Sequence, residues 1–370
     1  MDKVLESIQK DKLIVHVITD FSGIGGAEMM LSRLIKHTTN DYKHIIISLM
    51  GVSDVYKDTL DQCQEYYNLN WNGLNTVKII FKLKKILKKI SPCTIQCWMY
   101  HANVLTTISQ LGRTDKPDIF WGIHHSLSSL HQESISTRIA LALSKYFSNQ
   151  ASGIIYCAHS SLKHHEHFGL KNNNAKVIPN GVDLNKFDQH SKINDNCIIG
   201  FAGRYHPAKG YQYLFEVISE LKEFPLIFKI AGNGANLENA EIAKYFRKYA
   251  LDENKVILLD QVSNMREFYS SIDLFLMTSI TEGFPNVLVE AMASGVPCVS
   301  TDVGDAKFII GNYGYVAPSR NIKELKEHIL TYLNLSLDEK YKLKKLTRMR
   351  VEENFSIEVI SQCYVDFWSK

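Results

Sequence analysis

The chain has 370 residues, of which 45% are hydrophobic and 22% are charged, and its formal net charge is +3. This length allows two domains with separate cores, and the composition is that of an ordinary globular protein. A net charge of +3 is too small to indicate nucleic acid as the main partner.

Short β-branched runs alternate with longer amphipathic runs along the whole chain, which predicts parallel sheets covered by helices. In the first half we expect strands at 13–19, 44–50, 94–99, 118–123 and 153–158. In the second half we expect strands at 197–202, 226–231, 255–259, 273–277 and 297–300. Helices are expected between most of them, for example at 27–36 and 211–222.

Turn residues at Pro179, Asn180 and Gly181 close the first half, and a polar stretch without hydrophobic periodicity follows at 188–196. We therefore predict a linker at about 184–195 between two Rossmann-like α/β domains, 1–183 and 196–354. The last segment, 355–370, has an apolar face, and our hypothesis is that it packs back on the first domain. Ligands of such sheets bind beyond the carboxyl ends of the strands, so we expect the site in the cleft between the domains.

A glycine loop with Gly25 and Gly26 follows the first expected strand and precedes a helix. This arrangement lets backbone amides approach a ligand closely. The G-x-G-x-x-G spacing of dinucleotide-binding proteins is absent. A tight turn that needs glycine only for its geometry is an equally good interpretation.

Residues 77–90 contain six lysines and seven isoleucine, leucine or phenylalanine residues. On a helix they form an apolar stripe and a basic face, which suits the surface of an anionic bilayer. The alternative is a helix whose apolar stripe packs on the sheet while its lysines are solvated. The two interpretations are compatible.

Two adjacent histidines, His124 and His125, end the strand expected at 118–123. A histidine at this place can form a hydrogen bond with a sugar hydroxyl. No partner residues with the spacing of zinc ligands lie nearby. For the histidines at 164–167 we favour a polar helix face, so we predict no metal site.

Cations and carboxylates stand at two further strand ends. Arg204 and Lys209 follow the strand expected at 197–202, where they could neutralise a diphosphate or simply lie in a solvated loop. Near residue 281 a loop turns into a helix with Pro285 at its expected first position, and free N–H groups there attract phosphate. Glu282 and Glu290 flank this helix start and would accept hydrogen bonds from hydroxyl groups on either side.

These motifs resemble those of the family 4 retaining glycosyltransferases, which have the GT-B fold of two facing Rossmann-like domains. The likeness runs from the glycine loop at 23–28 through 178–183 and 200–210 to 281–301. Its most specific part is the E-x7-E motif in EGFPNVLVEAMASGVPCV. A departure is Asp260, where the family often has glycine. The resemblance therefore predicts a GT-B α/β fold.

The resemblance also implies roles for individual residues. The implied catalytic residues are Glu282 and His124 at the donor sugar, with His125 as the alternative, and Arg204 and Lys209 at the leaving diphosphate. The implied donor-binding residues are Gly25, Gly26, Gly203, Gly283, Phe284, Asn286, Val287 and, at the ribose, Glu290. Gly25 and Gly26 would approach either the phosphate or the acceptor. Val262 is a candidate contact of the base.

The predicted activity is transfer of a sugar, with retention, from a nucleotide-diphosphate donor, most simply a UDP-sugar. The acceptor would be a glycan or polyprenyl-linked glycan in the synthesis of a surface polysaccharide, for example capsule or lipopolysaccharide. No cofactor is expected, and because no Asp-x-Asp motif ends a strand, Arg204 and Lys209 would replace a metal. The alternatives are a UDP-sugar epimerase and a catalytically silent sugar-nucleotide-binding partner. Neither the sugar, the acceptor nor the oligomeric state is encoded in a recognisable motif.

The expected location is the cytoplasm, with peripheral contact to the inner face of the membrane through 77–90. The seven cysteines are scattered singly, without a Cys-x-x-Cys pair, which is typical of reduced thiols. The first residues are polar and the apolar runs are only strand-length, so we expect neither a signal peptide nor a transmembrane helix.

Overall fold

The computed structural model describes residues 12–127, 130, 133–189, 193–194 and 196–369. The chain divides into two compact units, and each is described by itself. The first unit comprises Met1–Gly181 and Ile357–Lys370, and the second comprises Val182–Ser356. The predicted domain end at 183 and the predicted return at 355 each lie two residues from these boundaries.

The first unit is built on a parallel sheet with the strand order β3-β2-β1-β4-β5-β6-β7. Its strands in chain order are β1 (Leu13–Ile18), β2 (Lys43–Ser48), β3 (Glu65–Asn68), β4 (Thr94–Trp98), β5 (Asp118–Ile123), β6 (Gly153–Tyr156) and β7 (Ala175–Val177). The central strands are buried on both faces, which explains their continuous apolar sequences.

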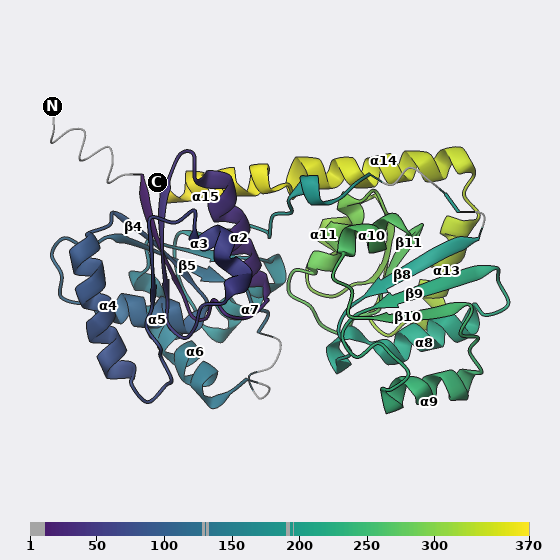
Figure 1. The fold of residues 1–370 in the computed structure, drawn as a ribbon, viewed down its shortest axis with the longest axis horizontal. Helices are drawn as coiled ribbons and strands as arrows, with labels where there is room; N and C mark the ends of the chain where they lie inside the picture. The colour runs from purple at the N-terminus through teal and green to yellow at the C-terminus, as the bar shows by residue number, and fades with distance from the viewer. Residues whose placement is uncertain (1–11, 128–129, 131–132, 190–192, 195, 370) are drawn as a thin grey trace. The chain divides into compact units, whose positions relative to one another are not determined.

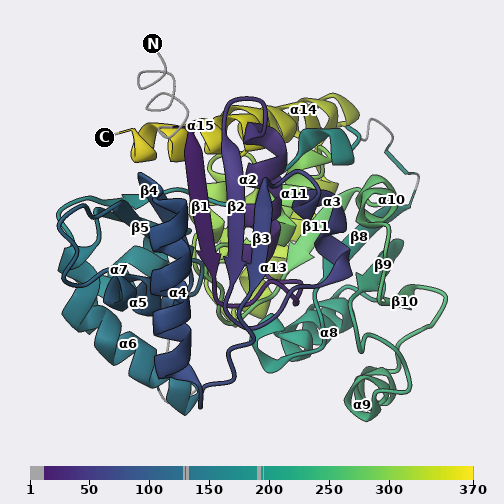
Figure 2. The same ribbon diagram turned by 60° about the vertical axis from the view of Figure 1, so that its left-hand side comes forward.

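Helices cover both faces of this sheet (Figures 1 and 2). On one face lie α4 (Thr76–Ile90), α5 (Tyr100–Ser109), α6 (Ile135–Phe147) and α7 (His159–Phe168). On the other lie α2 (Gly26–Thr38), α3 (Lys57–Leu60) and α15 (Ile357–Trp368). The last helix, α15, thus packs in the core of the first unit, and its Trp368 Nε1 donates a 2.9 Å hydrogen bond to Gln96 Oε1.

The second unit has a parallel sheet with the order β10-β9-β8-β11-β12-β13. Its strands in chain order are β8 (Cys197–Ala202), β9 (Leu226–Ala231), β10 (Val256–Asp260), β11 (Leu274–Met277), β12 (Cys298–Thr301) and β13 (Tyr315–Ala317). All ten predicted strands are present, with boundaries shifted by at most two residues. The short strands β3, β7 and β13 were not predicted.

Helices also cover both faces of the second sheet. The core on one face includes residues of α8 (Tyr211–Glu220), α9 (Ala240–Tyr249) and α13 (Ile322–Leu333). The remaining helices are α10 (Met265–Ser270), α11 (Asn286–Ala293), α12 (Ala306–Ile310) and α14 (Leu337–Asn354). Because strand side chains alternate between faces, Leu274 and Leu276 join that core, whereas Phe275 meets Tyr269 of α10.

The segment predicted as a linker lies inside the second unit. The Arg348 guanidinium donates a 3.0 Å hydrogen bond to the Phe187 carbonyl, and Asp188 forms an ion pair with Arg266. Residues 190–192 and 195 of the predicted linker lie outside the described residues. The described part before them is therefore packed against the second unit, because its side chains and carbonyls find partners there.

Candidate functional site

In the second unit, a lysine and a glutamate predicted to bind the donor lie in direct contact. The Lys209 Nζ donates a 2.7 Å hydrogen bond to Glu282 Oε1. The two side chains are 24% and 13% exposed, so the pair is largely but not fully covered. Lys209 ends a short 3₁₀ helix after β8, and Glu282 lies in the loop between β11 and α11. Both follow strand ends, as the sequence predicts.

Hydrogen bonds to backbone carbonyls hold the Lys209 and Glu282 loops together. The Thr278 hydroxyl donates to the carbonyl of Gly210 at 3.1 Å, and the Ile280 N–H donates to the Ala208 carbonyl at 2.7 Å. Gly210 has φ = 67°, and a Cβ there would lie 2.0 Å from the Thr278 carbonyl oxygen. Only glycine fits this approach, which brings Lys209 to Glu282.

A second donor fixes the Glu282 carboxylate. The buried Ser279 hydroxyl donates to the same atom, Oε1, at 2.7 Å. No hydrogen bond to Oε2 occurs within the part of the chain that the structure describes. Glu282 is thus held by one oxygen, and the other can accept a hydrogen bond from a ligand hydroxyl.

The helix after Glu282 differs slightly from its prediction. Pro285 has φ = −75° and ψ = 90° and caps α11, so the first helical residue is Asn286. The helix ends at Ala293, and Gly295, just after the Ser294 cap, has φ = 70° and stops it. Its first turn contains Asn286 and Val287, and N–H groups of a first helical turn lack intrahelical partners. The amide-rich helix start that the sequence predicts is present, one residue later.

Two neighbours of this helix start are anchored on the second unit. The Phe284 side chain is buried and its ring lies 5.9 Å from that of Phe355. The Gly283 carbonyl accepts a 3.0 Å hydrogen bond from the Asp305 N–H. Glu290 lies one helical turn after Asn286 and accepts a 3.2 Å hydrogen bond from the buried Tyr269 hydroxyl. Each acidic residue of the E-x7-E motif therefore has a fixed donor.

The loop after β8 leaves its arginine exposed. Arg204 has no side-chain hydrogen bond or ion pair among the described residues, whereas the Gly203 carbonyl accepts a 2.6 Å hydrogen bond from the Tyr211 hydroxyl. Val262, the candidate base contact, is half-buried in the loop between β10 and α10. The structure thus brings Lys209 and Glu282 together and leaves Arg204 and Val262 without a described contact to them.

Asp260 departs from the family pattern for a conformational reason that the structure explains. Its φ is +47°, in the left-handed region that favours glycine. Its carboxylate Oδ1 accepts a 2.8 Å hydrogen bond from the Gly234 N–H, which ties the β9 and β10 loops together. Asp260 therefore replaces glycine here by using its side chain as a loop acceptor.

In the first unit, His124 is held in one protonation state. Its Nδ1 lies 3.1 Å from Asn180 Oδ1, so Nδ1 carries the hydrogen and donates it. Burial lowers the pKa of His124 to about 4, against a smaller opposing effect of the Asn180 hydrogen bond. The Nε2 atom is buried and has no hydrogen-bond partner among the described residues. A neutral ring with hydrogen on Nδ1 leaves Nε2 as a hydrogen-bond acceptor, which a sugar hydroxyl can match as donor.

A chain of buried side chains supports the His124 ring. The ring stacks on Trp98 with centroids 5.1 Å apart. Trp98 Nε1 donates to His16 Nδ1 at 3.3 Å, and His16 Nε2 lies 3.0 Å from His44 Nδ1. His44 Nε2 in turn lies 3.0 Å from the Thr38 hydroxyl. Every ring nitrogen of Trp98, His16 and His44 has a partner, so Trp98 is fixed in position and orients His124.

The neighbouring histidines have other partners. His125 Nε2 lies 2.7 Å from Glu133 Oε1. In α7, His165 is buried and lies 2.6 Å from the Tyr100 hydroxyl, so it belongs to the core rather than to the predicted polar helix face. No group of three or more His, Cys, Asp or Glu side chains in the described residues is arranged to hold a metal ion.

The glycine loop of the first unit contains a carboxylate that the prediction did not consider. A Cβ at Gly25 would lie 2.4 Å from Oε2 of Glu28, which belongs to the first turn of α2. Burial raises the pKa of Glu28, and the nearby Asp20 raises it further. A side chain at Gly25 would therefore require the Glu28 carboxylate to move, and both interpretations of this loop stay open.

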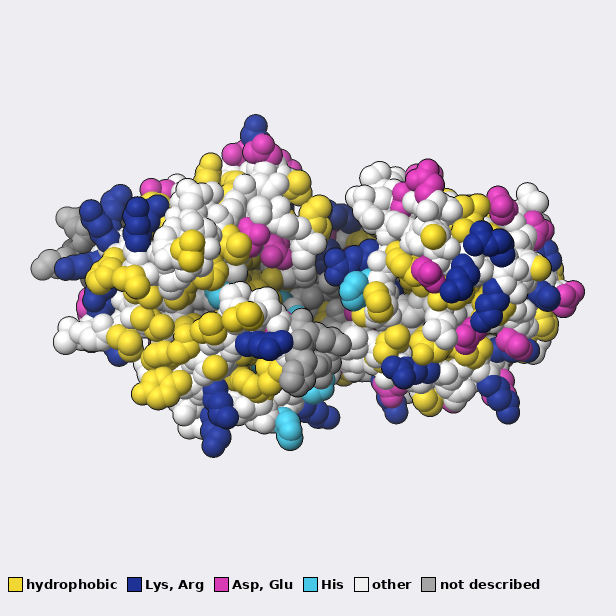
Figure 3. Space-filling model, turned by 90° about the horizontal axis from the view of Figure 1, so that it is seen from below, with side chains coloured by type: hydrophobic (Ala, Val, Ile, Leu, Met, Phe, Trp, Pro, Cys, Tyr) yellow, Lys and Arg dark blue, Asp and Glu magenta, His cyan; other side chains and the backbone are white. Residues whose placement is uncertain are grey.

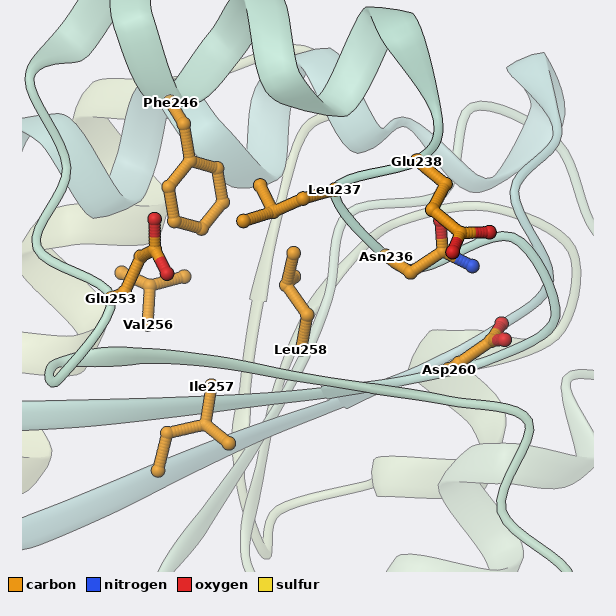
Figure 4. A pocket seen from close by; sticks show the side chains of 9 residues that line it. All are labelled: Asn236, Leu237, Glu238, Phe246, Glu253, Val256, Ile257, Leu258 and Asp260. Carbon is orange, nitrogen blue, oxygen red and sulfur yellow. The ribbon is translucent and has the colours of Figure 1, made fainter.

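A cavity of about 520 Å³ lies beside the edge strand β10 (Figure 4). Leu237, Phe246, Val256 and Leu258 form its apolar part, and Glu238, Glu253 and Asp260 are acidic residues of its lining. Neither Lys209 nor Glu282 lines it. This cavity is therefore separate from the candidate site formed by the loops of Lys209 and Glu282.

Comparison with known proteins assigns both units to one family. The family described as "Glycosyltransferase Family 4" matches residues 24–186, and "Glycosyl transferases group 1" matches residues 196–334. The chain belongs to the family 4 glycosyltransferases. Most of each unit is covered by one of these two matches.

Individual relatives match over shorter lengths. The capsular polysaccharide biosynthesis glycosyltransferase CapM of Staphylococcus aureus is 29% identical over 194 residues, 48% of each chain. A UDP-Gal:alpha-D-GlcNAc-diphosphoundecaprenol alpha-1,3-galactosyltransferase of Escherichia coli is 29% identical over 154 residues, 37% of this chain and 38% of the other. The family 4 chain thus spans about half, or less, of the length of these relatives.

Solved structures match over nearly the whole chain. The HepE protein of Anabaena in complex with UDP has a TM-score of 0.81 at 21% identity, covering 96% of this chain and 99% of that one. The lipopolysaccharide outer core galactosyltransferase WaaB has a TM-score of 0.76 at 18% identity, covering 96% and 98%. At such identities the likeness shows the fold, which is the predicted GT-B fold.

Proposed function

We propose that this family 4 glycosyltransferase moves a sugar, with retention of the anomeric configuration, from a UDP-sugar to a glycan or lipid-linked glycan of the cell surface. The observation that carries the proposal is the Lys209–Glu282 contact beside the start of α11. It places a cation, a carboxylate and helix N–H groups at one end of one sheet. A diphosphate with a sugar on one side and a ribose on the other matches these groups.

In this proposal, Lys209 neutralises the diphosphate when the donor binds. Its ammonium group then contacts a phosphate oxygen as well as Glu282. Glu282 Oε2 accepts a hydrogen bond from a hydroxyl of the donor sugar. The N–H groups of Asn286 and Val287 hold the diphosphate, and Glu290 accepts from the ribose. Arg204 is exposed, and its long side chain can add a second cation.

The rate enhancement is electrostatic. As the bond between sugar and diphosphate breaks, negative charge grows on the leaving diphosphate, so Lys209, Arg204 and the α11 start stabilise the transition state more than the ground state. The acceptor attacks on the same face of the sugar, and its proton passes to the leaving diphosphate. These residues supply the positive charge without any metal in the proposed reaction.

The first unit contributes hydrogen-bonding groups. His124, neutral and with Nε2 as acceptor, binds a hydroxyl of the donor sugar. At the glycine loop, the carboxylates of Glu28 and Asp20 disfavour phosphate, because like charges repel. Of the two ligands predicted for Gly25 and Gly26, the acceptor with its hydroxyl groups is therefore the better match.

The relatives support this choice of donor and acceptor. The Escherichia coli relative uses UDP-Gal and a diphosphoundecaprenol-linked sugar by its name, CapM is a capsule enzyme by its name, and HepE has been crystallised with UDP and with UDP-glucose. A UDP-sugar epimerase and a catalytically silent partner are not favoured, because the matched families and these relatives are glycosyltransferases.

Purified protein incubated with a panel of UDP-sugars and polyprenyl-diphosphate-linked acceptors tests the proposal. We expect release of UDP that depends on the acceptor, an α-linked product from an α-linked donor, and unchanged rates in the presence of EDTA. Free UDP-sugar interconverted without acceptor would instead indicate the epimerase. Binding of a UDP-sugar without any transfer would indicate the silent partner.

A further inference from the structure

Two helices on one face of the first unit, α4 and α6, contain basic residues but no acidic ones. The sequence of α4 has six lysines, and that of α6 has Arg138 and Lys145. Neither helix contains an Asp or Glu. Both pack against the same core through buried leucine and isoleucine side chains, so their outer faces carry the positive charge.

The outer faces of the same helices also expose large apolar side chains. On α4, Val77 and Phe81 are 68% and 67% exposed. On α6, Ile135, Ile139 and Tyr146 are 76%, 57% and 76% exposed. Their spacings of four and seven residues, about one and two helical turns, place each set in a row. Figure 3 shows hydrophobic side chains gathered on the face of the first unit that these helices form, with lysine and arginine side chains among them.

A lysine-rich helix of the second unit, α14, differs from α4 and α6 because it also contains acidic residues. The sequence of α14 is also rich in lysine and exposes Leu337 and Tyr341. It nevertheless contains Asp338, Glu339 and two further glutamates. The lysines of α14 thus share their helix with carboxylates, whereas α4 and α6 contain no acidic residue.

We propose that the exposed faces of α4 and α6, here called the α4–α6 surface, bind the anionic surface of a lipid bilayer. The lysines contact lipid phosphates while Phe81, Ile139 and Tyr146 enter the head-group region. The proposal deepens the proposed function, because a lipid-linked acceptor resides in such a bilayer. It differs from the sequence prediction for 77–90 in giving the apolar contacts largely to α6.

The charge of the surface selects a membrane rather than an apolar protein partner. The eight basic residues of these two helices, which contain no acidic residue, would repel a second copy of the same face, whereas each basic residue near an anionic bilayer strengthens binding about fivefold. Among the described residues no helix combines the length and apolarity needed to cross a bilayer. The α4–α6 surface is therefore suited to lie on the membrane.

Co-sedimentation of the full chain with vesicles, in the absence of nucleotide sugar, tests the proposal. We expect binding to phosphatidylcholine vesicles containing phosphatidylglycerol, weakening as salt rises, and at least tenfold weaker binding to phosphatidylcholine alone. Failure of the wild-type protein to bind the anionic vesicles would overturn the proposal.

Variants then locate the contact. Lys84→Gln with Lys85→Gln should weaken binding to anionic vesicles about 25-fold, and Phe81→Ser with Ile139→Ser and Tyr146→Ser should weaken it at least tenfold. The matched control variants on α14 are Lys342→Gln with Lys345→Gln, and Leu337→Ser with Tyr341→Ser. Equal losses in the α4–α6 and α14 variants would contradict the assignment to this surface.

Two further measurements separate this proposal from others. If light scattering shows a wild-type dimer that Phe81→Ser converts to a monomer, the surface binds a second copy and the membrane proposal is wrong.

With a water-soluble acceptor, the α4–α6 variants should retain wild-type transfer rates, and only transfer to acceptor in vesicles should fall. Loss of transfer to both acceptors would contradict a role in membrane binding alone, and absence of transfer in the wild type would refute the proposed function without affecting vesicle binding.

Discussion

Lys209 Nζ and Glu282 Oε1 lie 2.7 Å apart, although 73 positions separate the two residues in the chain. The contact occupies one carboxylate oxygen, which the Ser279 hydroxyl also contacts at 2.7 Å. The cation and the carboxylate therefore hold each other in position before a donor arrives. Charged groups that are already in position stabilise a transition state more than groups that must reorient during the reaction.

Removing the charge of either partner should slow transfer strongly. For Lys209→Met and for Glu282→Gln we expect kcat to fall roughly 10²- to 10³-fold, because each loses a group aimed at the reacting sugar diphosphate. Steady-state UDP release measures the effect, and thermal unfolding checks that the variants are folded. Glu223→Gln, an exposed glutamate of the same unit, is the control. A loss of less than fivefold in both variants would refute the site.

Tyr269 should act on the ribose through Glu290. Its buried hydroxyl donates to Glu290 Oε2 at 3.2 Å, and Tyr269→Phe removes that donor without leaving a large cavity. A hydrogen bond to a charged group contributes about 1.5 kcal/mol or more, so the Kd of UDP should rise about tenfold. Calorimetry with UDP and with 2′-deoxy-UDP measures whether the loss depends on the ribose hydroxyl.

The control for this prediction is Tyr332→Phe. Tyr332 is equally buried in the second unit, and its hydroxyl donates to the Asp273 carbonyl at 3.0 Å. It should destabilise the fold slightly without changing the affinity for UDP. If Tyr269→Phe weakens UDP and 2′-deoxy-UDP equally, Tyr269 does not act through the ribose.

Gly304 should be required for the position of the Glu282 loop. Its φ is +58°, and a Cβ there would lie 2.3 Å from the Gly283 carbonyl oxygen and 2.7 Å from that of Glu282. Gly304→Ala must therefore displace the loop that carries Glu282. We expect a loss of transfer activity of at least tenfold together with a lower melting temperature.

Gly311 gives the matched control, since its φ is also +58° and the nearest atom to its Cβ would be an arginine side-chain nitrogen at 3.5 Å. Gly311→Ala also places a side chain on a backbone with positive φ, but without the clash. It should lower the melting temperature and leave kcat close to that of the wild type. Equal activity losses in the two variants would show that strain, and not displacement of the loop, limits the enzyme.

The sequence was sufficient to predict most strands of both sheets, because buried parallel strands have continuous apolar sequences. Every long central strand was predicted, from β1 to β12. The strands β3, β7 and β13 have three or four residues and, apart from the buried Ala317, consist of half-buried or exposed residues, so their sequences lack that pattern. Their position as strands depends on pairing with a neighbour already in the sheet, which no local pattern contains.

The site was predicted to the extent that its residues follow strand ends. Lys209 and Glu282 were found in this way, whereas Ser279, Tyr269 and Asn180 were not. These three act by holding a predicted residue in position, and two of them do so from far along the chain, because Asn180 is 56 positions from His124 and Tyr269 is 21 from Glu290. Only Ser279, three residues before Glu282, was close enough for the sequence to suggest a partner.

The buried histidines of the first unit should make it sensitive to mild acid. Burial lowers the pKa of His44, His124 and His165 to about 4, against about 6.5 in an unfolded chain. Between these values the unfolded state binds more protons, so the free energy of unfolding falls as pH decreases from 6.5 towards 4. At pH 5 each histidine would cost about 2 kcal/mol of stability relative to pH 7.

Tryptophan fluorescence measures this loss in the first unit alone. The four tryptophans of the chain, Trp71, Trp98, Trp121 and Trp368, all belong to that unit. The urea midpoint of the fluorescence transition should fall clearly between pH 7 and pH 5, a range in which most carboxylates stay ionised. His165→Gln removes one titrating group and should reduce the fall. A midpoint that stays constant over this range would mean that the histidines are not neutral in the folded unit.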